Sequence, residues 1–376
     1  MEKKKVLILY APLGVGHGAA ANAIAEVFAL EHPDIEVKNV NVLDFVPDMF
    51  KQGLPWFYNQ ATSKMPILYK WIYSYYNYKS TSKNLSNLSR IILKKSKFIE
   101  FLKDFDPDFI ISTNPLSMQL VSLTKEEEII NILSANVCTD FGFYPLWHNK
   151  DVNYYFVTNE EIKKSLIKYG VSVDKIKITG IPVSLKFSNE LNREKIIKND
   201  LKFNPLHPIL LIVGGRIMYK NLLKIINGIK NKNSIVQFIV VAGRDKILQE
   251  KLKESEITND PLVRVFGFIN NIEDYMTVAD LILTKAGGLT VSECLVKNLP
   301  MVFNSIIPGQ EEDNVKYTVR QKVGVKAEGV KKSVEVINRL FFKSKKIAEM
   351  KKNCIKIAKP SAAKDVVDFV VLNIKK

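Results

Sequence analysis

The segment LILYAPLGVGHGAAANAIAEVF at residues 7–28 decides the fold at the start of the chain. An apolar run typical of a buried strand ends at Gly14, Gly16 and His17, and a helix of small residues follows at once. Glycines between a strand and a helix let the backbone approach a ligand closely. Gly14, Gly16 and Ala19 also satisfy the dinucleotide fingerprint G-x-G-x-x-A, so the loop raises the question of which ligand it holds.

A nicotinamide-dependent oxidoreductase is the weaker interpretation of this loop. A dinucleotide site needs an acidic residue about 20 positions beyond the glycines, at the end of the second strand. The nearest candidate, Asp44, lies 28 positions beyond Gly16. A neutral imidazole, in contrast, can take a proton from a hydroxyl group near pH 7. We therefore interpret His17 as a candidate general base, and a histidine that only caps or orients the loop is the alternative.

Buried apolar runs alternate with helical segments along almost the whole chain. Strands that are buried on both faces and separated by helices indicate parallel sheets. The first series is KVLILYA, IEVKNVNVL, PDFIIST, IINILSANV, VNYYFVT and IKITGIP, and the second is PILLIVGG, SIVQFIVVAG, LVRVFGF, ADLILTKAGG and LPMVFN. The sequence thus predicts an α/β protein of two Rossmann-like, doubly wound domains facing across a cleft.

The expected domain limits follow from the two series of strands. We expect an N-terminal domain at residues 1–190, a C-terminal domain at residues 191–358, and a final helix within residues 359–376 that docks back on the first domain. Ligands of open α/β sheets bind outside the carboxyl ends of the strands. The glycine pairs Gly214-Gly215 and Gly287-Gly288 both fall at such ends.

Composition excludes several classes of protein. The chain contains no apolar run of about 18 residues that would span a bilayer. Its basic, apolar start predicts a buried first strand rather than a signal peptide, because a patterned helix follows Gly14. The three cysteines, Cys138, Cys294 and Cys354, are too far apart for a disulfide framework or a zinc site, and they suit a reducing cytoplasm.

A basic, aromatic segment predicts contact with an anionic membrane surface. The formal net charge is +16, and residues 51–100 carry nine Lys or Arg against one acid. Within 67–76, apolar and aromatic residues recur on one helical face, as in an interfacial helix. Peripheral association with the inner face of the cell membrane is therefore expected. A stripe packed in the core is the alternative, and nucleic-acid binding is disfavoured because no binding motif accompanies the charge.

A second glycine loop, within TKAGGLTVSECL at residues 284–295, has the features of a diphosphate site. Gly287 and Gly288 end a strand, and Thr290 lies near the start of the next helix, whose amino terminus carries partial positive charge. Glu293 lies one turn further, where it can accept hydrogen bonds from ribose hydroxyls. The next strand ends in PGQEEDN, which offers amide and carboxylate groups for sugar hydroxyls.

The acidic pair in DFDPD at residues 104–108 matches a metal-binding D-x-D pattern by letters alone. Asp104 and Asp106 stand between a helix and the strand FIIST, with Pro107 next to them. A turn into a buried strand is the better interpretation. We expect no metal and no other cofactor.

These motifs together resemble glycosyltransferase family 28, of the GT-B architecture, and especially its diacylglycerol glycosyltransferase and monogalactosyldiacylglycerol synthase branch. The resemblance covers nearly the whole chain. It rests on GVGHGAA, TDFGFYPLW, VTNEEIKKSLIKYGVSVDKIKITGIPV, LLIVGG, TKAGGLTVSECL and PGQEEDN. The peptidoglycan N-acetylglucosaminyltransferase of the same family matches less well.

The resemblance implies roles for particular residues. His17 would face the reacting carbon as the base, with Asp140 as the competing base or an orienting partner. Acceptor and loop residues would be Gly14, Gly16, Tyr144 and Trp147. The donor, a UDP-hexose, would be held by residues of the second domain and its glycine loops, namely Gly214, Gly215, Arg216, Phe268, Ile269, Gly287, Gly288, Thr290, Glu293, Gln310, Glu311 and Asn314.

The implied reaction is an inverting transfer of a hexose from a UDP-sugar to diacylglycerol, with glucose as the expected sugar and galactose as the alternative. Repeated addition of sugars is a further expectation, and transfer to another lipid-linked acceptor is the alternative. Two departures from the family pattern affect the details. Tyr144 stands where the family usually has histidine, and Arg216 stands where the family prefers a small residue.

Overall fold

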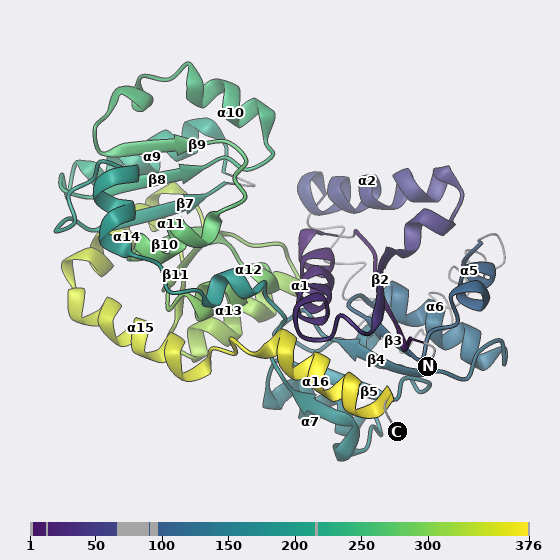
Figure 1. Cartoon of the computed structure of the whole chain (residues 1–376). Helices are drawn as coiled ribbons and strands as arrows, with labels where there is room; N and C mark the ends of the chain where they lie inside the picture. Colours follow the sequence, from purple (N-terminus) through teal and green to yellow (C-terminus); the bar gives the residue numbers. More distant parts are fainter. Residues whose placement is uncertain (1–2, 13, 66–89, 91–96, 215–216, 375–376) are drawn as a thin grey trace. The chain divides into compact units, whose positions relative to one another are not determined.

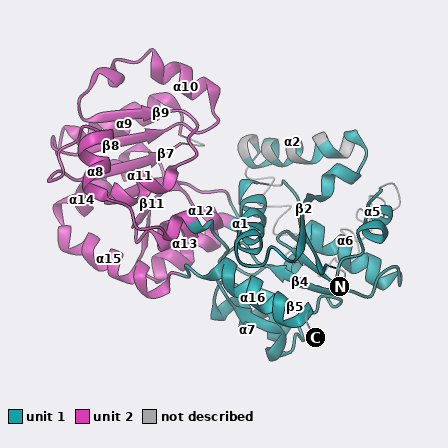
Figure 2. Ribbon diagram, viewed as in Figure 1, with its two compact units in different colours: residues 1–185, 308–310, 359–376 teal, residues 186–307, 311–358 magenta. Residues whose placement is uncertain are grey.

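The computed structural model describes residues 3–12, 14–65, 90, 97–214 and 217–374 of the chain. It divides into two compact units, which Figure 2 colours separately. Unit 1 comprises Met1–Leu185, Pro308–Gln310 and Lys359–Lys376, and unit 2 comprises Lys186–Ile307 and Glu311–Ala358. The first boundary thus falls at Leu185, five residues before the limit set from the sequence, and no sequence pattern indicated the Pro308–Gln310 insertion.

Unit 1 contains a six-stranded sheet in the order β2-β1-β3-β4-β5-β6, and every pairing is parallel. Its strands are β1 (Lys5–Tyr10), β2 (Glu36–Asn41), β3 (Phe109–Ser112), β4 (Leu133–Val137), β5 (Tyr154–Val157) and β6 (Ile176–Ile178). The direction of winding reverses between β1 and β3. This reversal is the topological switch point at which doubly wound sheets bind ligands.

The central strand β1 shows why the apolar run folds this way. Val6 and Ile8 belong to one buried cluster, whereas Leu7 and Leu9 belong to another, and all four side chains are fully buried. Successive side chains of a strand point to opposite faces of its sheet. An unbroken apolar run therefore gives a strand with a core on each face.

Helices cover both faces of the unit 1 sheet (Figure 1). They are α1 (Val15–Glu31), α2 (Asp48–Lys64), α5 (Phe98–Phe105), α6 (Pro115–Glu126), α7 (Glu160–Lys168) and α16 (Ala362–Ile374). The side chains of Asn114 and Asn159 cap α6 and α7 by accepting hydrogen bonds from backbone N–H groups at their starts. Near the end of the chain, α16 packs against α1, and Val366 and Val370 share a core with Ile24.

Unit 2 contains a second parallel six-stranded sheet, in the order β12-β11-β10-β7-β8-β9. Its strands are β7 (Ile209–Val213), β8 (Gln237–Val241), β9 (Val263–Phe266), β10 (Leu281–Lys285), β11 (Met301–Ser305) and β12 (Gly324–Lys326). The order corresponds to the 3-2-1-4-5-6 arrangement of dinucleotide-binding domains, and the switch point lies between β7 and β10.

The helices of unit 2 also cover both faces of its sheet (Figure 1). They are the one-turn α8 (Arg193–Lys195), α9 (Tyr219–Lys230), α10 (Lys246–Lys253), α11 (Ile272–Val278), α12 (Gly288–Val296), α13 (Gln310–Arg320), α14 (Val330–Phe342) and α15 (Ser344–Ile357). The α/β fold class is therefore confirmed. The sequence predicted every strand except β12, a three-residue edge strand with too little apolar sequence to recognise.

The acidic DFDPD segment forms a turn. Helix α5 ends at Phe105, and Asp106 adopts a left-handed conformation with φ 48° as its cap. The carboxylate of Asp108 accepts hydrogen bonds from the Lys4 ammonium and the Lys5 backbone N–H, each at 2.8 Å, next to the start of β3. Asp106 and Asp108 thus have roles in local structure.

Part of the proposed membrane segment can be described. The apolar face predicted within 67–76 lies outside the described residues. Just before it, α2 carries Trp56 and Phe57, which are 63% and 52% exposed. Among the helices that the structure describes, none combines the length and apolar character needed to cross a bilayer.

Candidate functional site

The glycine loop of unit 1 places His17 at the carboxyl end of β1. Gly14 is the cap residue before α1 and has φ 96°, a conformation that side-chain-bearing residues rarely adopt. Gly18 lies against Tyr10, and a Cβ at this position would approach the Tyr10 ring to 3.2 Å. These glycines let the chain turn sharply from β1 into α1 and bring the first helical turn close to the sheet.

His17 has a defined protonation pattern. Its Nδ1 lies 2.9 Å from the carbonyl oxygen of Thr113 and 2.9 Å from Oγ1 of Thr139. Because a carbonyl oxygen can only accept, Nδ1 must carry the hydrogen, and the lone pair of the neutral ring is then on Nε2. Among the described residues, none forms a hydrogen bond with Nε2. The imidazole therefore presents a proton acceptor.

Burial keeps this imidazole neutral. Desolvation lowers the pKa of His17 to about 4, and the hydrogen bond with the Thr113 backbone opposes that shift in part. Only 7% of the residue is exposed. At neutral pH the ring is therefore uncharged, and its lone pair on Nε2 carries no proton.

Neighbouring strand ends hold the histidine in place. Thr113 follows β3 and Thr139 follows β4, so both residues lie at the same edge of the sheet as the loop after β1. The Thr113 hydroxyl donates to the backbone carbonyl of His17 at 3.0 Å. His17 thus lies at the switch point between β1 and β3, and its loop is tied to the neighbouring strands.

Asp140 lies beside this cluster and has several partners. Its carboxylate accepts hydrogen bonds from Gln310 Nε2, at 2.8 Å to each oxygen, and from the Tyr144 hydroxyl at 3.2 Å. The residue is 1% exposed. The structure therefore brings together Asp140, Tyr144 and Gln310, which the sequence had assigned to different tasks.

Two aromatic residues complete this part of unit 1. Trp147 is fully buried, and its ring centroid lies 6.4 Å from that of His17 and 5.5 Å from that of Tyr144. Tyr144, which replaces the histidine of the family pattern, is 7% exposed and directs its hydroxyl to Asp140. Trp147 thus lies beside the candidate base and Tyr144 beside Trp147, and the acceptor role of both residues stays a prediction.

The glycine loop of unit 2 lies between β10 and α12. Gly287 is the cap residue and Gly288 the first residue of α12, so the unpaired N–H groups and positive dipole end of the helix are at this loop. A Cβ on Gly287 would lie 2.9 Å from Nζ of Lys285. The absence of a side chain therefore leaves room for the ammonium group beside the helix start. Thr290 lies in the first turn of the same helix.

Lys285 is held by an acid that the sequence had assigned to the sugar. Its Nζ lies 3.1 Å from Oε1 of Glu311, whose Oε2 accepts from the Ile307 backbone N–H at 2.9 Å. Glu311 is 3% exposed. Both carboxylate oxygens are thus engaged within the protein, in a position that supports the glycine loop.

Asn314 supports the same loop from within the core. It is fully buried, and its Nδ2 donates to the carbonyl oxygen of Ala286 at 2.9 Å. Ala286 directly precedes the glycine pair. Asn314 therefore fixes the backbone just before the glycine pair, and Glu311 fixes the side chain of Lys285.

Glu293 is a half-buried acid one turn into α12. Burial raises its pKa to about 8, nearby Glu273 acts in the same direction, and Lys186 and Lys285 oppose the shift. The carboxyl group therefore holds its proton at neutral pH. A group that titrates so close to neutrality responds to a ligand that donates hydrogen bonds to it.

The other donor-side residues lie at the carboxyl ends of neighbouring strands. Gly214 follows β7, and a Cβ there would lie 3.1 Å from the Val241 carbonyl oxygen. Phe268 and Ile269 follow β9, and Phe268 is 52% exposed with the Arg244 guanidinium 4.7 Å from its ring centroid. Gly215 and Arg216 lie outside the described residues.

Sequence reasoning missed Lys285 and Arg244 as parts of this site. Lys285 directly precedes the glycine loop in TKAGG, and Arg244 follows the end of β8 in AGRD. Their positions at strand ends were a usable signal. A lysine-rich sequence hides that signal, because most of its basic residues only solvate the surface.

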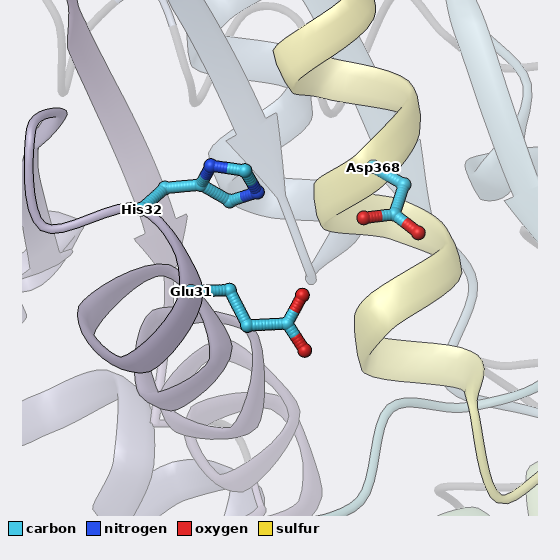
Figure 3. Close-up of side chains that lie close together, drawn as sticks. All are labelled: Glu31, His32 and Asp368. Atoms are coloured by element: carbon cyan, nitrogen blue, oxygen red, sulfur yellow. The ribbon is translucent and has the colours of Figure 1, made fainter.

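One cluster of side chains in the described part of the chain has the ligand types and spacing of a metal site. Glu31, His32 and Asp368 have ligand atoms within 4.8 Å of one another, and Figure 3 shows their side chains between α1 and α16. The ammonium group of Lys364 pairs with both Glu31 and Asp368. The two carboxylates thus already share a cation, and the group joins the two helices.

Comparison with known proteins identifies relatives across both units. The family model for monogalactosyldiacylglycerol (MGDG) synthase matches residues 17–183, and the model for the glycosyltransferase family 28 C-terminal domain matches residues 209–366. Monogalactosyldiacylglycerol synthase 1 of Arabidopsis thaliana is 30% identical over 380 residues, covering 97% of this chain and 70% of that protein. Processive diacylglycerol beta-glucosyltransferase of Bacillus cereus is 28% identical over 378 residues, covering 99% and 94%.

Solved structures agree on the fold. MurG of Acinetobacter baumannii has a TM-score of 0.60 at 15% identity, covering 97% of this chain and 99% of that chain. MnaA of S. aureus, solved with UDP, has a TM-score of 0.65 at 10% identity, covering 99% and 97%. The two parallel sheets therefore have the GT-B architecture.

Proposed function

Because this chain belongs to the monogalactosyldiacylglycerol synthase family within glycosyltransferase family 28, we propose that it transfers a hexose from a UDP-sugar to diacylglycerol. The product is a glycosyldiacylglycerol, a membrane glycolipid. Unit 1 would supply the base and bind the acceptor, and unit 2 would bind the nucleotide-sugar. The expected inversion turns an α-linked donor into a β-glycoside.

The protonation of His17 carries this proposal. The acceptor hydroxyl oxygen bonds to the anomeric carbon while its proton passes to Nε2 of His17. The bond from that carbon to the diphosphate oxygen breaks, and the electron pair leaves with UDP. Nδ1 donates to the Thr113 carbonyl, which fixes the ring with Nε2 as the acceptor. A general base must be unprotonated before it acts, and a buried neutral imidazole meets that condition at pH 7.

The glycine loop of unit 2 supplies the positive charge for the leaving diphosphate. The first N–H groups of α12 and the Lys285 ammonium lie together there, with Gly287 leaving space between them. Such a helix terminus favours anions, and a lysine adds a full charge. We therefore propose that no divalent cation is needed. EDTA is expected to leave turnover unchanged, and a loss restored by Mg²⁺ or Mn²⁺ contradicts this point.

The remaining donor contacts follow from positions at the strand ends. Glu293 would receive the ribose hydroxyls, and the backbone at Phe268 and Ile269 would meet the uracil. Gln310 would contact the sugar. Its neighbour Glu311 acts through Lys285, to which it is already paired.

We propose glucose as the transferred sugar and repeated transfer as a property of the enzyme. The chain covers 94% of the Bacillus cereus glucosyltransferase, which is named as processive, but 70% of the Arabidopsis galactolipid synthase. The match to the bacterial relative is thus the more complete in length. Products with one and with several hexoses are expected.

The proposed acceptor, diacylglycerol, is a membrane lipid, so the protein would have to approach a membrane surface. The chain carries a net charge of +16, and α2 exposes Trp56 and Phe57. Aromatic side chains prefer the headgroup boundary, and each basic residue near anionic lipid contributes about 1 kcal/mol. We propose peripheral association with the cytoplasmic face of an anionic membrane.

A product assay tests the proposal. The purified protein is incubated with UDP-glucose, UDP-galactose or UDP-N-acetylglucosamine and with vesicles containing diacylglycerol, with and without phosphatidylglycerol. Mass spectrometry and NMR of the lipid extract identify the sugar, the number of residues and the anomer. UDP release with a β-glucosyl lipid is expected, fastest with anionic vesicles. Transfer only to a polyprenyl-diphosphate-linked acceptor supplied in parallel contradicts the diacylglycerol assignment.

A further inference from the structure

The contact between Asp140 and Gln310 joins two segments separated by 170 positions in the sequence. Gln310 Nε2 lies 2.8 Å from each carboxylate oxygen of Asp140. The segment Pro308–Gln310 belongs to unit 1 although the chain on either side of it belongs to unit 2. The Asp140–Gln310 contact thus holds a segment of only three residues against unit 1. We therefore consider whether this contact has a functional role in addition to packing.

The carboxylate determines which end of the Gln310 amide faces outward. A carboxylate only accepts hydrogen bonds, so the NH₂ group of the amide must face Asp140. The amide oxygen Oε1 lies on the other side of the same planar group. Among the described residues, none donates a hydrogen bond to Oε1. Gln310 therefore presents an acceptor, and its donor end is occupied.

The surroundings keep Asp140 in this orientation. The Tyr144 hydroxyl donates to Oδ2, and the Thr158 hydroxyl donates to the Asp140 backbone carbonyl at 2.9 Å. Gly309, with φ 92°, turns the chain so that Gln310 begins α13. Both partners of the contact are thus fixed by their own segments.

We propose that Asp140 is a positioning residue that sets the Gln310 amide so that Oε1 accepts a hydrogen bond from a hydroxyl of the donor sugar. This inference rests on the proposed function. It separates the two candidates for the base: Asp140 is engaged with an amide donor, whereas His17 has an open acceptor nitrogen. Asp140 then serves recognition of the sugar, and His17 serves proton transfer.

The test compares binding of UDP with binding of UDP-glucose by calorimetry, and includes steady-state kinetics. In D140N, the new side-chain amide faces that of Gln310, so the Gln310 amide can flip and exchange the positions of Nε2 and Oε1. The affinity for UDP-glucose is expected to weaken and its KM to rise by up to about tenfold, because one neutral hydrogen bond between the Gln310 amide oxygen and a sugar hydroxyl is lost. The affinity for UDP is expected to stay unchanged, because UDP has no hexose. The control D34N removes an exposed carboxylate of unit 1 and is expected to change neither.

Reversal of the pair gives a second arm. Q310E places two carboxylates against each other and is expected to weaken UDP-glucose binding more than D140N does. D140N/Q310E restores a donor facing an acceptor, with a glutamate oxygen left for the sugar, and is expected to recover at least tenfold over Q310E. A merely structural contact would not distinguish UDP from UDP-glucose. Equal loss of both affinities, or no recovery in the double variant, overturns the proposal.

Two further results keep the test decisive. If turnover of D140N falls by about 10²-fold or more while its UDP-glucose affinity is unchanged, Asp140 is the base and the proposal is overturned. If D140N does not fold, ¹⁵N NMR of the wild-type Gln310 side-chain amide replaces it: protons slowed in exchange support the contact, and freely exchanging protons overturn it. Failure of the wild type to bind any UDP-hexose would instead refute the proposed function, before any variant is measured.

Discussion

The two glycine loops of this protein have the same architecture and different chemistry. Each follows a buried strand next to a switch point of a parallel sheet, and each leads directly into a helix. The unit 1 loop holds His17, whose burial lowers its pKa to about 4. The unit 2 loop holds the ammonium of Lys285 beside a helix start. In the proposed function, backbone geometry brings a ligand near in both cases, and one side chain decides whether the site takes a proton or holds an anion.

The glycines themselves differ between the loops. Gly14 has φ 96°, so it is needed for its conformation, whereas Gly287 has φ −65° and is needed for space. An identical substitution therefore has different consequences in the two units. The comparison predicts separable effects on proton transfer, donor binding and folding.

The largest effect is expected from H17Q. Loss of the base should slow turnover by about 10²-fold or more, because general-base catalysis contributes that much. UDP binding should be unchanged, since the proposed UDP site belongs to unit 2. Steady-state kinetics and calorimetry measure the two quantities, with H32Q, a change at the other end of α1, as the control. Near wild-type turnover, or a parallel loss of UDP affinity, contradicts the assignment.

A smaller effect is expected from K285M. It removes the cation beside the glycine pair and leaves the Glu311 carboxylate, which is 3% exposed, without its lysine partner. UDP should bind about tenfold more weakly, and the free energy of unfolding should fall by about 1–3 kcal/mol.

The control for Lys285 is K316M on the same unit, whose Nζ pairs with Asp313 at 2.8 Å on a surface where the lysine side chain is 73% exposed. Exposed pairs of this kind contribute little to stability. Equal behaviour of the two variants, measured by calorimetry and chemical denaturation, contradicts a specific role for Lys285.

Alanine at the two glycines sharpens the comparison further. G14A forces a side chain into a left-handed conformation and should cost about 1–3 kcal/mol of stability. G287A keeps an ordinary conformation, but its Cβ would lie 2.9 Å from Lys285 Nζ, so the flexible ammonium must move. Thermal denaturation should therefore show a loss of stability in G14A and none in G287A. The KM for the donor should rise several-fold in G287A, which corresponds to a loss of binding free energy below about 1.4 kcal/mol. Equal destabilisation by both changes is the contrary outcome.

The smallest effect is a proton released when UDP binds. Free Glu293, with a pKa of about 8, is protonated at pH 7. Hydrogen bonds from ribose hydroxyls favour the carboxylate and lower that pKa. At pH 7 Glu293 is then protonated in the free protein and less protonated in the complex, so UDP binding releases a proton. The affinity for UDP therefore rises with pH up to about 8 and levels off above it.

Calorimetry in two buffers of different ionisation enthalpy measures this release. The wild type should release less than one proton per UDP at pH 7. E293Q should release none and show a flat pH dependence. No release from the wild type would show that Glu293 does not meet the ribose.

The sequence predicted the strands because unbroken apolar runs, such as VLIL in β1, have few alternatives to burial on both faces. It did not predict the strand order, because pairing of β1 with β3 depends on contacts across about 100 positions of sequence. The three-residue β12 was missed because local sequence this short contains little information. Fold class thus follows from local pattern, and topology from long-range packing.

The candidate site divides in the same way. His17 and the Gly287-Gly288 pair were recognised because glycines at strand ends are a local signal. The contact of Asp140 with Gln310 spans 170 positions and has no local signature. Lys285 was overlooked among many surface lysines. The apolar face within 67–76 stays a prediction, since it lies outside the described residues.

The central claim is that His17 is a neutral imidazole with its hydrogen on Nδ1 and its lone pair on Nε2. A ¹⁵N NMR titration of histidine-labelled protein tests it most directly, with H17Q used to assign the resonance. We predict the Nδ1–H tautomer at pH 7 and a pKa close to 4, well below the usual 6.5. An Nε2–H tautomer, or an imidazolium at pH 7, would contradict the account.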